Sequence, residues 1–442
     1  MIYFYAFCIS CIKVVNVKLQ VKHCDRLKGN IKVSGSKNAS LALMACCLLT
    51  NEEIVLENFP NILDTKNMLK ILKEIGVKSK YNVFKKTLKL KTIKIIPNLI
   101  TKNMKKLRAS YYVMGGLVSN RLNFESLYPG GCSFMNRPID YHLNAFEKLG
   151  YEIEKSEECI KFKTSDISDF PIEIKLEKPS IGATINILIA SVKRFNKTII
   201  YNPALEPEVI QVIELLNKMG AFIKYDNQKI IIKGVERLHG TKFKIMPDRI
   251  EAGSYLLLGL AHPTSKITLT NVESKYLEEV LTVIRKMGGL INIKNQSIEL
   301  ISPTKLNAID VVIDIYPSFP TDLQQILTVV CTKAEETSTI TDNIYVGRFS
   351  QVKELKKAGC TIDTLDNKIV INPTNLSGTT LEAQDLRCGF ACIVIGSIAN
   401  NVTVIEKSEN IFRGYEKILT KLKKIHIREQ NLLASSQIGV IV

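Results

Sequence analysis

Apolar residues recur three or four positions apart in five segments of the chain, and each segment runs into a glycine. The segments are NMLKILKEIG, YHLNAFEKLG, VIQVIELLNKMG, YLEEVLTVIRKMG and FSQVKELKKAG, which end at Gly76, Gly150, Gly220, Gly288 and Gly359. This spacing predicts amphipathic helices, each followed by a C′ glycine with positive φ. The glycines are 74, 70, 68 and 71 residues apart, so we expect a unit of about 70 residues to repeat. A sixth segment, RGYEKILTKLKKI, ends at His426 in place of glycine.

Each unit opens with a helix of another kind, rich in small apolar residues, which precedes a β-rich run. Residues such as Ala39, Ala42, Gly115, Gly116 and Gly253 allow helices to pack closely. We therefore expect buried central helices with sheets outside them. Six mixed βα units suit two α/β domains of three units each, although a solenoid of repeats would show the same period.

Polar or charged residues stand at the start of these first helices. They are Lys37-Asn38, Arg108, Ser180-Ile181-Gly182, Asp248-Arg249, Thr321-Asp322 and Asp385-Leu386-Arg387. A helix N-terminus offers unpaired N–H groups and a partial positive charge, so six convergent helix starts would form an anion site. With the nearby Arg137, Arg348 and Arg413, the basic residues indicate a highly charged substrate. A surface ion pair would explain any one of these arginines, but not the recurrence of polar or charged residues at equivalent positions in six units.

The 442-residue chain carries 60 Lys and Arg against 43 Asp and Glu, a formal net charge of +17. A basic chain can bind nucleic acid, an anionic membrane surface or small anionic substrates, or it can simply have lysine-rich surface loops. The basic runs lack the interleaved aromatic residues of a single-strand binder. The charge is also dispersed, which disfavours nucleic acid as a partner.

Eleven cysteines lie at irregular spacings, many of them inside apolar runs, such as Cys46, Cys47, Cys331 and Cys392. This usage is typical of reduced, buried thiols in a cytoplasmic protein. The pair in residues 8–11 forms a CxxC without a second pair, so we expect no zinc site there. The first fifteen residues are apolar but short for a membrane span, and they lack the features of a signal peptide. No membrane insertion is expected.

A Pro-Gly-Gly loop at residues 129–131 stands apart from the rest of the chain. Cys132 follows the two glycines and lies five residues before Arg137. This setting exposes a thiol and lowers its pKa. Cys132 is therefore a candidate general acid or nucleophile.

Ten motifs together resemble those of the UDP-N-acetylglucosamine enolpyruvyl transferase family, in the order of that family. They are GSKNAS (35–40), LRASYYVMGGL (107–117), PGGCSFMNRPIDYH (129–142), PSIGAT (179–184), EPEV (206–209), PDRIEAG (247–253), YPSFPTDLQ (316–324), GRF (347–349), DLR (385–387) and RGYE (413–416). The resemblance extends from about Leu27 to Leu422. A sister branch that makes 5-enolpyruvylshikimate 3-phosphate favours a Ser-Lys-Ser opening and lacks the cysteine loop. Lys37-Asn38 and Cys132 therefore favour the UDP-sugar branch.

The resemblance implies a fold of two inside-out α/β barrel domains, built from six repeated βα units, with the active site in the cleft between them. Domain one would contain residues 1–36 and 247–442. Domain two would contain residues 37–246 and carry the Cys132 loop. The loop would close over the sugar nucleotide, which would bind first.

The resemblance also implies the reaction, in which the enolpyruvyl group of phosphoenolpyruvate moves to the 3′-hydroxyl of UDP-N-acetylglucosamine by addition and elimination, with release of phosphate. Asp322 would be the base, Cys132 the proton donor and Lys37 a further catalytic contact. The phosphoenolpyruvate site would contain Lys37, Asn38, Arg137, Arg387 and Arg413. The UDP-N-acetylglucosamine site would contain Arg108, Arg137, Pro138, Ile139, Asp140, Tyr141, Lys178, Pro179, Ser180, Ile181, Asp322 and Ile344. No metal or organic cofactor is expected, because phosphoenolpyruvate is itself activated; homo-oligomerisation is left open.

Other interpretations are open at this level. The chain could use another acceptor, could be a non-catalytic regulatory paralogue that binds UDP-sugar, or could bind nucleic acid through its basic surface. Asp322 could be an N-cap of the helix that follows Pro320, because aspartate is favoured there.

Four places depart from the family pattern. They are Leu205, Met135-Asn136, Ser318 and the C-terminus after Lys424, which has lost its glycine. The last should weaken the packing of the sixth unit. None removes a residue assigned to chemistry, so we expect an active enzyme.

Overall fold

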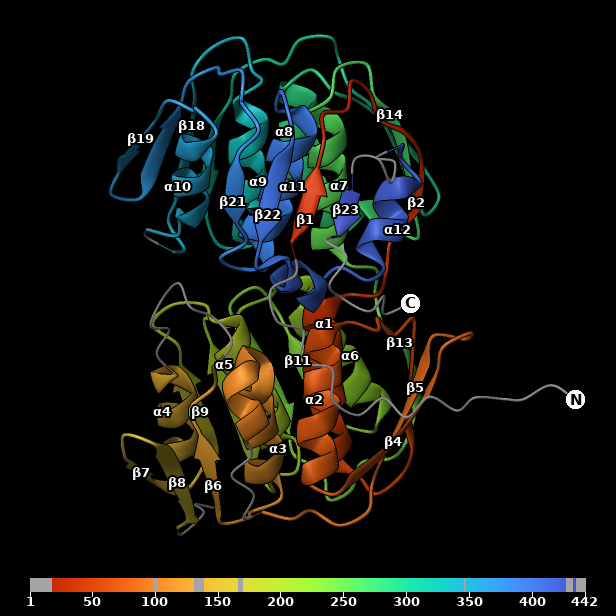
Figure 1. The fold of residues 1–442 in the computed structure, drawn as a ribbon. Helices are drawn as coiled ribbons and strands as arrows, with labels where there is room; N and C mark the ends of the chain where they lie inside the picture. The colour runs from red at the N-terminus through yellow and green to blue at the C-terminus, as the bar shows by residue number, and fades with distance from the viewer. Residues whose placement is uncertain are drawn as a thin grey trace, which may run out of the picture.

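The computed structural model describes residues 18–97, 102–130, 139–165, 170–345, 347–426 and 432–434. Among these residues the strands form five sheets of four strands and one sheet of three. The buried side chains form two hydrophobic cores. One core is built by residues between 19–33 and between 250–425, and the other by residues between 39 and 246. The region around the first core is called domain one and forms the upper half of Figure 1. The region around the second core is called domain two and forms the lower half.

Domain two contains the first three units. The first unit is formed by α1 (Lys37–Ala45), η1 (Cys46–Leu49), β3 (Ile54–Glu57), α2 (Leu63–Glu74), β4 (Val77–Asn82), β5 (Thr87–Thr92) and the later strand β13 (Lys242–Lys244). The second is formed by η2 (Lys102–Lys106), η3 (Arg108–Tyr111), α3 (Tyr112–Ser119), β6 (Phe124–Leu127), α4 (Asp140–Lys148), β7 (Tyr151–Lys155) and β8 (Cys159–Thr164). The third is formed by β9 (Ile172–Lys175), α5 (Ile181–Ser191), β10 (Lys197–Tyr201), α6 (Pro207–Lys218), β11 (Phe222–Tyr225) and β12 (Lys229–Lys233).

Domain one contains the other three units. The fourth unit is formed by β2 (Lys28–Lys32), α7 (Arg249–Leu260), β14 (Lys266–Thr270), η4 (Ser274–Tyr276), α8 (Glu278–Lys286), β15 (Leu290–Lys294) and β16 (Ser297–Ile301). The fifth is formed by β17 (Asp310–Ile313), α9 (Thr321–Cys331), β18 (Ser338–Asp342), α10 (Ser350–Lys357), β19 (Ile362–Leu365) and β20 (Lys368–Ile371). The sixth is formed by β21 (Thr380–Glu382), α11 (Leu386–Ile398), β22 (Thr403–Glu406), η5 (Ser408–Arg413), α12 (Ile418–Lys423), and the terminal strands β1 (Leu19–Val21) and β23 (Leu432–Ala434).

The first and fourth units exchange a strand. β2 precedes α1 in the chain but pairs in parallel with β14 of domain one. β13 precedes α7 but pairs in parallel with β3 of domain two. The two crossing segments are hydrogen-bonded to each other, from the Ser36 N–H to the Met246 carbonyl (2.8 Å) and from the Asp248 N–H to the Ser34 carbonyl (2.8 Å). The domain boundaries predicted above, at 36/37 and 246/247, remain our proposal, and these crossings support it.

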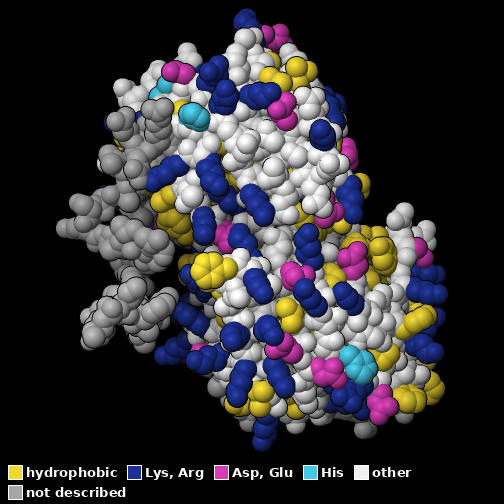
Figure 2. All heavy atoms as spheres, turned by 90° about the vertical axis from the view of Figure 1, so that its right-hand side faces the viewer, with side chains coloured by type: hydrophobic (Ala, Val, Ile, Leu, Met, Phe, Trp, Pro, Cys, Tyr) yellow, Lys and Arg dark blue, Asp and Glu magenta, His cyan; other side chains and the backbone are white. Residues whose placement is uncertain are grey.

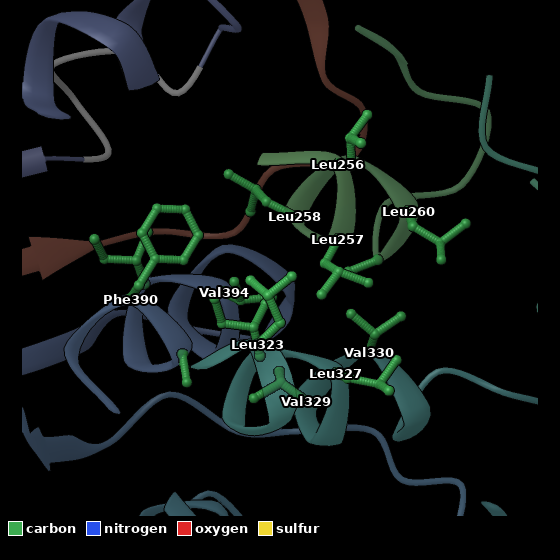
Figure 3. Close-up of a cluster of buried hydrophobic side chains, with 14 of the residues drawn as sticks. Leu256, Leu257, Leu258, Leu260, Leu323, Leu327, Val329, Val330, Phe390 and Val394 are labelled. Atoms are coloured by element: carbon green, nitrogen blue, oxygen red, sulfur yellow. The ribbon is translucent and has the colours of Figure 1, made fainter. Parts of the chain in front are cut away.

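The first helices of the units are buried at the centre of each domain, as predicted, and the sheets lie outside them. In domain one, α9 contacts both α7 and α11, and Figure 3 shows Leu256, Leu323 and Phe390 from these three helices in one cluster. Small residues permit this approach. A Cβ at Gly253 would lie 2.3 Å from Leu323 Cδ1, and a Cβ at Gly115 would lie 2.4 Å from Asn186 Oδ1.

The predicted C′ glycines are confirmed. Gly76, Gly150, Gly220, Gly288 and Gly359 have φ between +91° and +106°. In the sixth unit His426 takes the same position with φ +70°, and its N–H donates to the Lys423 carbonyl at 3.1 Å. The packing of this unit is retained, since Ile418, Leu422 and Ile425 are buried.

Cys46, Cys47, Cys331 and Cys392 are buried free thiols, as predicted. Burial raises the pKa of Cys47 and of Cys331 to about 12, so these thiols stay protonated. The CxxC and the apolar first fifteen residues lie outside the described residues. Over the described part of the chain, no helix has the length and apolar character that a bilayer crossing requires.

Candidate active site

Four helix starts meet where the two domains join. Ser36 caps α1, accepting a hydrogen bond from the Ala39 N–H, and Asp248 caps α7 through the N–H groups of Ile250 and Glu251. The second oxygen of Asp248 accepts a hydrogen bond from the Lys37 N–H at 2.8 Å. The start of α1 in domain two is thereby fixed to the start of α7 in domain one.

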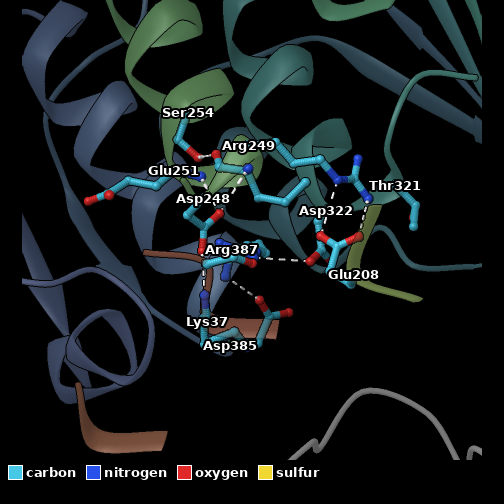
Figure 4. A network of polar contacts seen from close by, with 12 residues as sticks. Lys37, Glu208, Asp248, Arg249, Glu251, Ser254, Thr321, Asp322, Asp385 and Arg387 are labelled. Atoms are coloured by element: carbon cyan, nitrogen blue, oxygen red, sulfur yellow. Dashed lines mark hydrogen bonds and ion pairs between the residues drawn. The ribbon is translucent and has the colours of Figure 1, made fainter. Parts of the chain in front are cut away.

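Asp322 lies in the first turn of α9, and two arginines hold its carboxylate. Its Oδ1 is 3.1 Å from Arg348 Nη2 and its Oδ2 is 3.0 Å from Arg387 Nη2; Figure 4 shows the contact with Arg387. Burial alone would raise the pKa of Asp322, but Arg387, Arg348 and Lys37 outweigh it and hold the pKa well below its ordinary value. The interpretation of Asp322 as an N-cap is wrong. Pro320 occupies that position and no side chain caps the helix.

Asp64, near the start of α2, forms a second carboxylate–cation group. Its Oδ1 is 3.0 Å from Arg413 Nε and its Oδ2 is 3.5 Å from Lys37 Nζ. Burial lowers the pKa of the Lys37 ammonium, Asp64 opposes this shift, and Arg387 adds to it. The charges of Lys37 and Asp322 also affect each other's pKa, so the two groups share one site. Asn38, the next residue of α1, is half-buried.

Arg387 is oriented from its other side by a tyrosine. Its Nη1 donates to the Tyr415 hydroxyl at 3.1 Å, and that hydroxyl is 2.8 Å from Ser254 Oγ. Asp385 caps α11 by accepting hydrogen bonds from the N–H groups of Arg387 and Cys388. The guanidinium is therefore fixed by Asp322 of α9 and by Tyr415 of the RGYE segment, and Ser254 of α7 holds the Tyr415 hydroxyl.

Apart from Asp322, the described residues that were predicted for UDP-N-acetylglucosamine lie outside this carboxylate–cation group. Arg108 begins η3 and lies 6.0 Å from the centre of the Tyr111 ring. Tyr141 in α4 donates to Glu177 at 3.4 Å. Ser180 caps α5 and receives the Ala183 N–H at 3.3 Å. Their chain neighbours are Ile139 and Asp140 at the start of α4, and Lys178, Pro179 and Ile181 at the start of α5. Ile344 lies apart from them, after β18 in domain one.

His142, which the sequence left without a role, is buried beside the Tyr111 ring, with the two ring centres 4.6 Å apart. Its Nδ1 is 2.8 Å from the Asn186 side-chain nitrogen, whose amide also bonds the Tyr111 carbonyl and the Gly115 N–H. Burial, with Arg108 adding to it, lowers the pKa of His142 to about 3. A neutral His142 thus supports the Arg108–Tyr111 segment.

Cys132, Arg137 and Pro138 lie outside the described residues, as does Met135-Asn136. Their assigned roles stay predictions.

Sequence reasoning missed several charged residues of the site. Asp64 is an acidic residue in the first turn of a helix, a common and unremarkable position, so nothing in the sequence connected it with Lys37 or Arg413. Arg249 is buried, with its Nε 3.1 Å from Glu208 Oε1 and its Nη2 3.2 Å from Glu208 Oε2. Arg249 was recognised as a helix start, but nothing in the sequence connected the EPEV and PDRIEAG motifs, so the pair with Glu208 was missed.

The arrangement has a clear chemical capacity. Lys37, Arg413 and Arg387 present three cations that can bind the carboxylate or phosphate of a small anion. Asp322 is an ionised carboxylate that can accept a proton once its arginines are engaged elsewhere.

Comparisons with known proteins identify the family of the chain. Residues 21–422 match the family described as EPSP synthase (3-phosphoshikimate 1-carboxyvinyltransferase). A protein of Listeria innocua named UDP-N-acetylglucosamine 1-carboxyvinyltransferase 2 is 38% identical over 92% of this chain and 96% of its own. A Bacillus cereus protein of the same name is 38% identical over 92% and 94%.

Solved structures share the fold. The enolpyruvyl transferase NikO of Streptomyces tendae matches with a TM-score of 0.84 at 19% identity, over 93% of this chain and 98% of its own. EPSP synthase of Acinetobacter baumannii matches with a TM-score of 0.75 at 14% identity, over 95% and 100%. The fold class of two α/β domains is thereby confirmed. The chain belongs to the EPSP synthase family and is an enolpyruvyl (1-carboxyvinyl) transferase.

Proposed function

We propose that this enzyme transfers the enolpyruvyl group of phosphoenolpyruvate to the 3′-hydroxyl of UDP-N-acetylglucosamine in the cytoplasm, with release of phosphate, as the first committed step of peptidoglycan synthesis. The observation that carries the proposal is the carboxylate of Asp322, held by Arg348 and Arg387 beside Lys37. The names of the relatives at 38% identity support UDP-N-acetylglucosamine as the acceptor.

Phosphoenolpyruvate supplies the anions that the cations can bind. Lys37 and Arg413 share Asp64 in the structure, and both are partly accessible. A bound phosphate or carboxylate would compete with Asp64 and Asp322 for these cations. Withdrawal of Arg387 from Asp322 would raise the pKa of Asp322 toward its ordinary value, because Arg387 is the cation that lowers it most. Substrate binding would thus convert a paired carboxylate into a base.

The base then accepts the proton of the sugar hydroxyl while the oxygen attacks C2 of phosphoenolpyruvate. C3 gains a proton, for which Cys132 is our predicted donor. In the second step the tetrahedral adduct loses a proton from C3 and expels phosphate, restoring the double bond. Cations around the departing phosphate stabilise its charge.

The experiment that tests the function is phosphate release from phosphoenolpyruvate, measured with UDP-N-acetylglucosamine, with shikimate 3-phosphate and without acceptor. We expect release only with the UDP-sugar. Release only with shikimate 3-phosphate would place the chain in the sister branch, and no release with either would contradict the proposal.

A matched variant tests the role of the cysteine loop. Cys132→Asp should retain transfer, because a carboxyl group can also donate a proton, but should lose irreversible inactivation by a thiol-directed epoxide of the fosfomycin type. Irreversible inactivation of that variant would show that another group reacts. Cys159→Asp, at a half-buried cysteine in β8, is the control and should be inactivated like the wild type.

A further inference from the structure

The sheet β13-β3-β5-β4 of domain two has one face on the core and one face in solvent. On β5, Leu88 and Leu90 are buried, whereas Lys89 and Lys91 are exposed. The register places Lys91 directly opposite Lys78 of β4 and Lys89 directly opposite Lys80. Like charges in directly opposed positions destabilise a strand pair, so these lysine pairs do not serve the stability of the sheet.

Six exposed lysines form this solvent face, which we call the lysine face: Lys78, Lys80, Lys89, Lys91, Lys242 and Lys244. Two carboxylates partly neutralise it, since Glu53 pairs with Lys89 at 2.7 Å and Glu57 pairs with Lys242 at 2.9 Å. Lys78, Lys80 and Lys91 form no ion pair with any residue that the structure describes. Figure 2 shows Lys and Arg side chains gathered over domain two on the side of the molecule that carries β4, β5 and β13. The lysine face therefore keeps an excess of positive charge.

The β4–β5 turn adds an apolar tip beside these cations. Val83 is 57% exposed and Phe84 is 98% exposed. The turn is nevertheless held in place. Asn82 Oδ1 accepts the Lys85 N–H at 3.0 Å, and the Lys86 carbonyl accepts the Phe59 N–H at 2.9 Å. An ordered turn thus presents an aromatic ring to solvent, and none of the residues that the structure describes covers it.

We propose that the lysine face and the Val83–Lys85 tip dock onto the surface of an anionic lipid bilayer. Lysines on a flat face are attracted to acidic headgroups, and an exposed aromatic ring enters the boundary between headgroups and acyl chains. The two signals together bind a surface that neither would hold alone. The contact is peripheral and involves no spanning helix.

The same features fit nucleic acid less well. A single-strand binder places aromatic rings between its cations so that successive bases can stack. Here the exposed ring lies at the tip of the turn. Between Lys89 of β5 and Lys242 of β13, the strand register places Val55 of β3, which is not aromatic.

The first test is co-sedimentation of the full-length protein with phosphatidylcholine vesicles, with and without phosphatidylglycerol. We expect sedimentation only with phosphatidylglycerol, and we expect it to weaken as NaCl increases, because salt screens exposed charges. Absence of binding to phosphatidylglycerol vesicles at low salt would overturn the proposal.

Two matched pairs of variants locate the contact. The combined Lys78→Gln, Lys80→Gln and Lys91→Gln variant should bind vesicles on the order of 100-fold more weakly, from roughly fivefold for each lysine near the surface. The combined Lys286→Gln, Lys294→Gln and Lys356→Gln variant, with the same change in net charge at exposed lysines of domain one, should bind like the wild type. Equal losses in both would mean that net charge alone causes binding and would contradict a defined docking surface.

The tip is tested by fluorescence, since the chain contains no tryptophan. Phe84→Trp introduces a single reporter, and its emission should shift to shorter wavelength on addition of phosphatidylglycerol vesicles. Phe195→Trp is the control, because Phe195 is also strongly exposed, at 84%, and has basic neighbours. It lies in the loop before β10, which belongs to another sheet. The proposal fails if both reporters shift alike or if neither does. It also fails if the Lys78, Lys80 and Lys91 variant loses binding to RNA while vesicle binding is unchanged.

Discussion

The site contains two aspartates that each bind two cations, and the two groups are built differently. Asp322 and both of its arginines belong to domain one, on α9, α11 and the segment before α10. Asp64 belongs to domain two, where it meets Lys37 of its own domain and Arg413 of domain one. The Asp322 carboxylate is 28% exposed, whereas that of Asp64 is 2% exposed. One group is complete within a domain, and the other joins two domains.

The difference assigns different tasks to the two carboxylates. Asp322 is accessible, and both of its oxygens are occupied by cations that an anionic substrate can attract. Its proton affinity therefore depends on the substrate. Asp64 is inaccessible, so it cannot exchange protons with a substrate and can only position Lys37 and Arg413. We infer that Asp322 acts in chemistry and that Asp64 aligns the cations across the domain junction.

The largest expected effect comes from removing each negative charge in turn. Asp322→Asn should lower kcat by about 10²–10⁴-fold, because proton transfer by a positioned base contributes that much. Asp64→Asn should instead raise KM for phosphoenolpyruvate by roughly tenfold with a smaller change in kcat, because it loosens binding groups. Steady-state phosphate release measures both constants.

Asp363→Asn is the control for these variants. Asp363 is an exposed residue of β19, and its replacement should leave kcat and KM unchanged. If Asp64→Asn lowered kcat as strongly as Asp322→Asn, the division between a chemical and a positioning carboxylate would be wrong.

Asp322→Asn should have the larger effect on kcat, but Asp64→Asn should have the larger effect on the free energy of unfolding. Asp64→Asn leaves Lys37 and Arg413 without a buried counter-charge, so the free energy of unfolding should fall by about 3–5 kcal/mol. Asp322→Asn should cost less, about 1–2 kcal/mol, because solvent reaches this carboxylate and screens its ion pairs. Urea unfolding of the ligand-free protein measures both values, and a larger loss for Asp322→Asn would contradict the argument from burial.

The sequence predicted those parts of the fold that depend on local patterns. The spacing of apolar residues and the C′ glycines identified six units, and even the loss of glycine at His426 preserved the left-handed backbone. The exchange of β2 and β13 between units depends on pairs more than 180 residues apart, such as Lys242 with Val55. No local pattern determines such a pairing, and only the resemblance to a known family implied that the chain crosses twice.

For the candidate site, too, the sequence predicted residues with a local signal and missed those that depend on distant contacts. Helix starts with basic residues pointed to Lys37 and Arg387, and the structure brings both of them to Asp322. Asp64 was not predicted, because its partner Arg413 lies 349 residues away and an aspartate in a first helical turn is ordinary. Burial, which separates Asp64 from Asp322, cannot be read from either short segment.

Glu206 is a third carboxylate of the same region and extends the comparison of Asp322 with Asp64. Unlike those two, it has an oxygen without a hydrogen-bond partner among the described residues. Its Oε2 is buried and accepts no hydrogen bond from the described residues. Burial raises its pKa to about 7; Glu208 adds to the rise and Arg249 opposes it. Because the unfolded chain releases this proton near the ordinary value of 4.5, the folded state binds more protons between these pH values, and its stability should decrease as pH rises through this window.

Glu206→Gln should remove this dependence. The difference in unfolding free energy between variant and wild type should change by about 3 kcal/mol between about pH 5 and pH 8, in favour of the variant at the higher pH. Urea midpoints across this range measure it, and Glu214→Gln, on the adjacent helix α6, is the control. A difference that does not vary with pH would mean that Glu206 is ionised throughout, as Asp322 is.

The smallest expected effect concerns another ion pair between the domains. Lys86 of the β4–β5 turn binds Glu416 of domain one at 2.6 Å, with Lys86 36% exposed and Glu416 3% exposed. Glu416 also accepts hydrogen bonds from Ser34 and from the Asn61 N–H, so it keeps two partners when the lysine is lost. Lys86→Met should therefore lower the free energy of unfolding by only about 1 kcal/mol, much less than Asp64→Asn. Lys89→Met removes a pair that is exposed at both ends and should have no measurable effect. If Lys86→Met cost as much as Asp64→Asn, the two hydrogen bonds that Glu416 keeps would not compensate for the lost lysine, and the larger cost predicted for Asp64→Asn would no longer follow from the cations that it leaves unpaired.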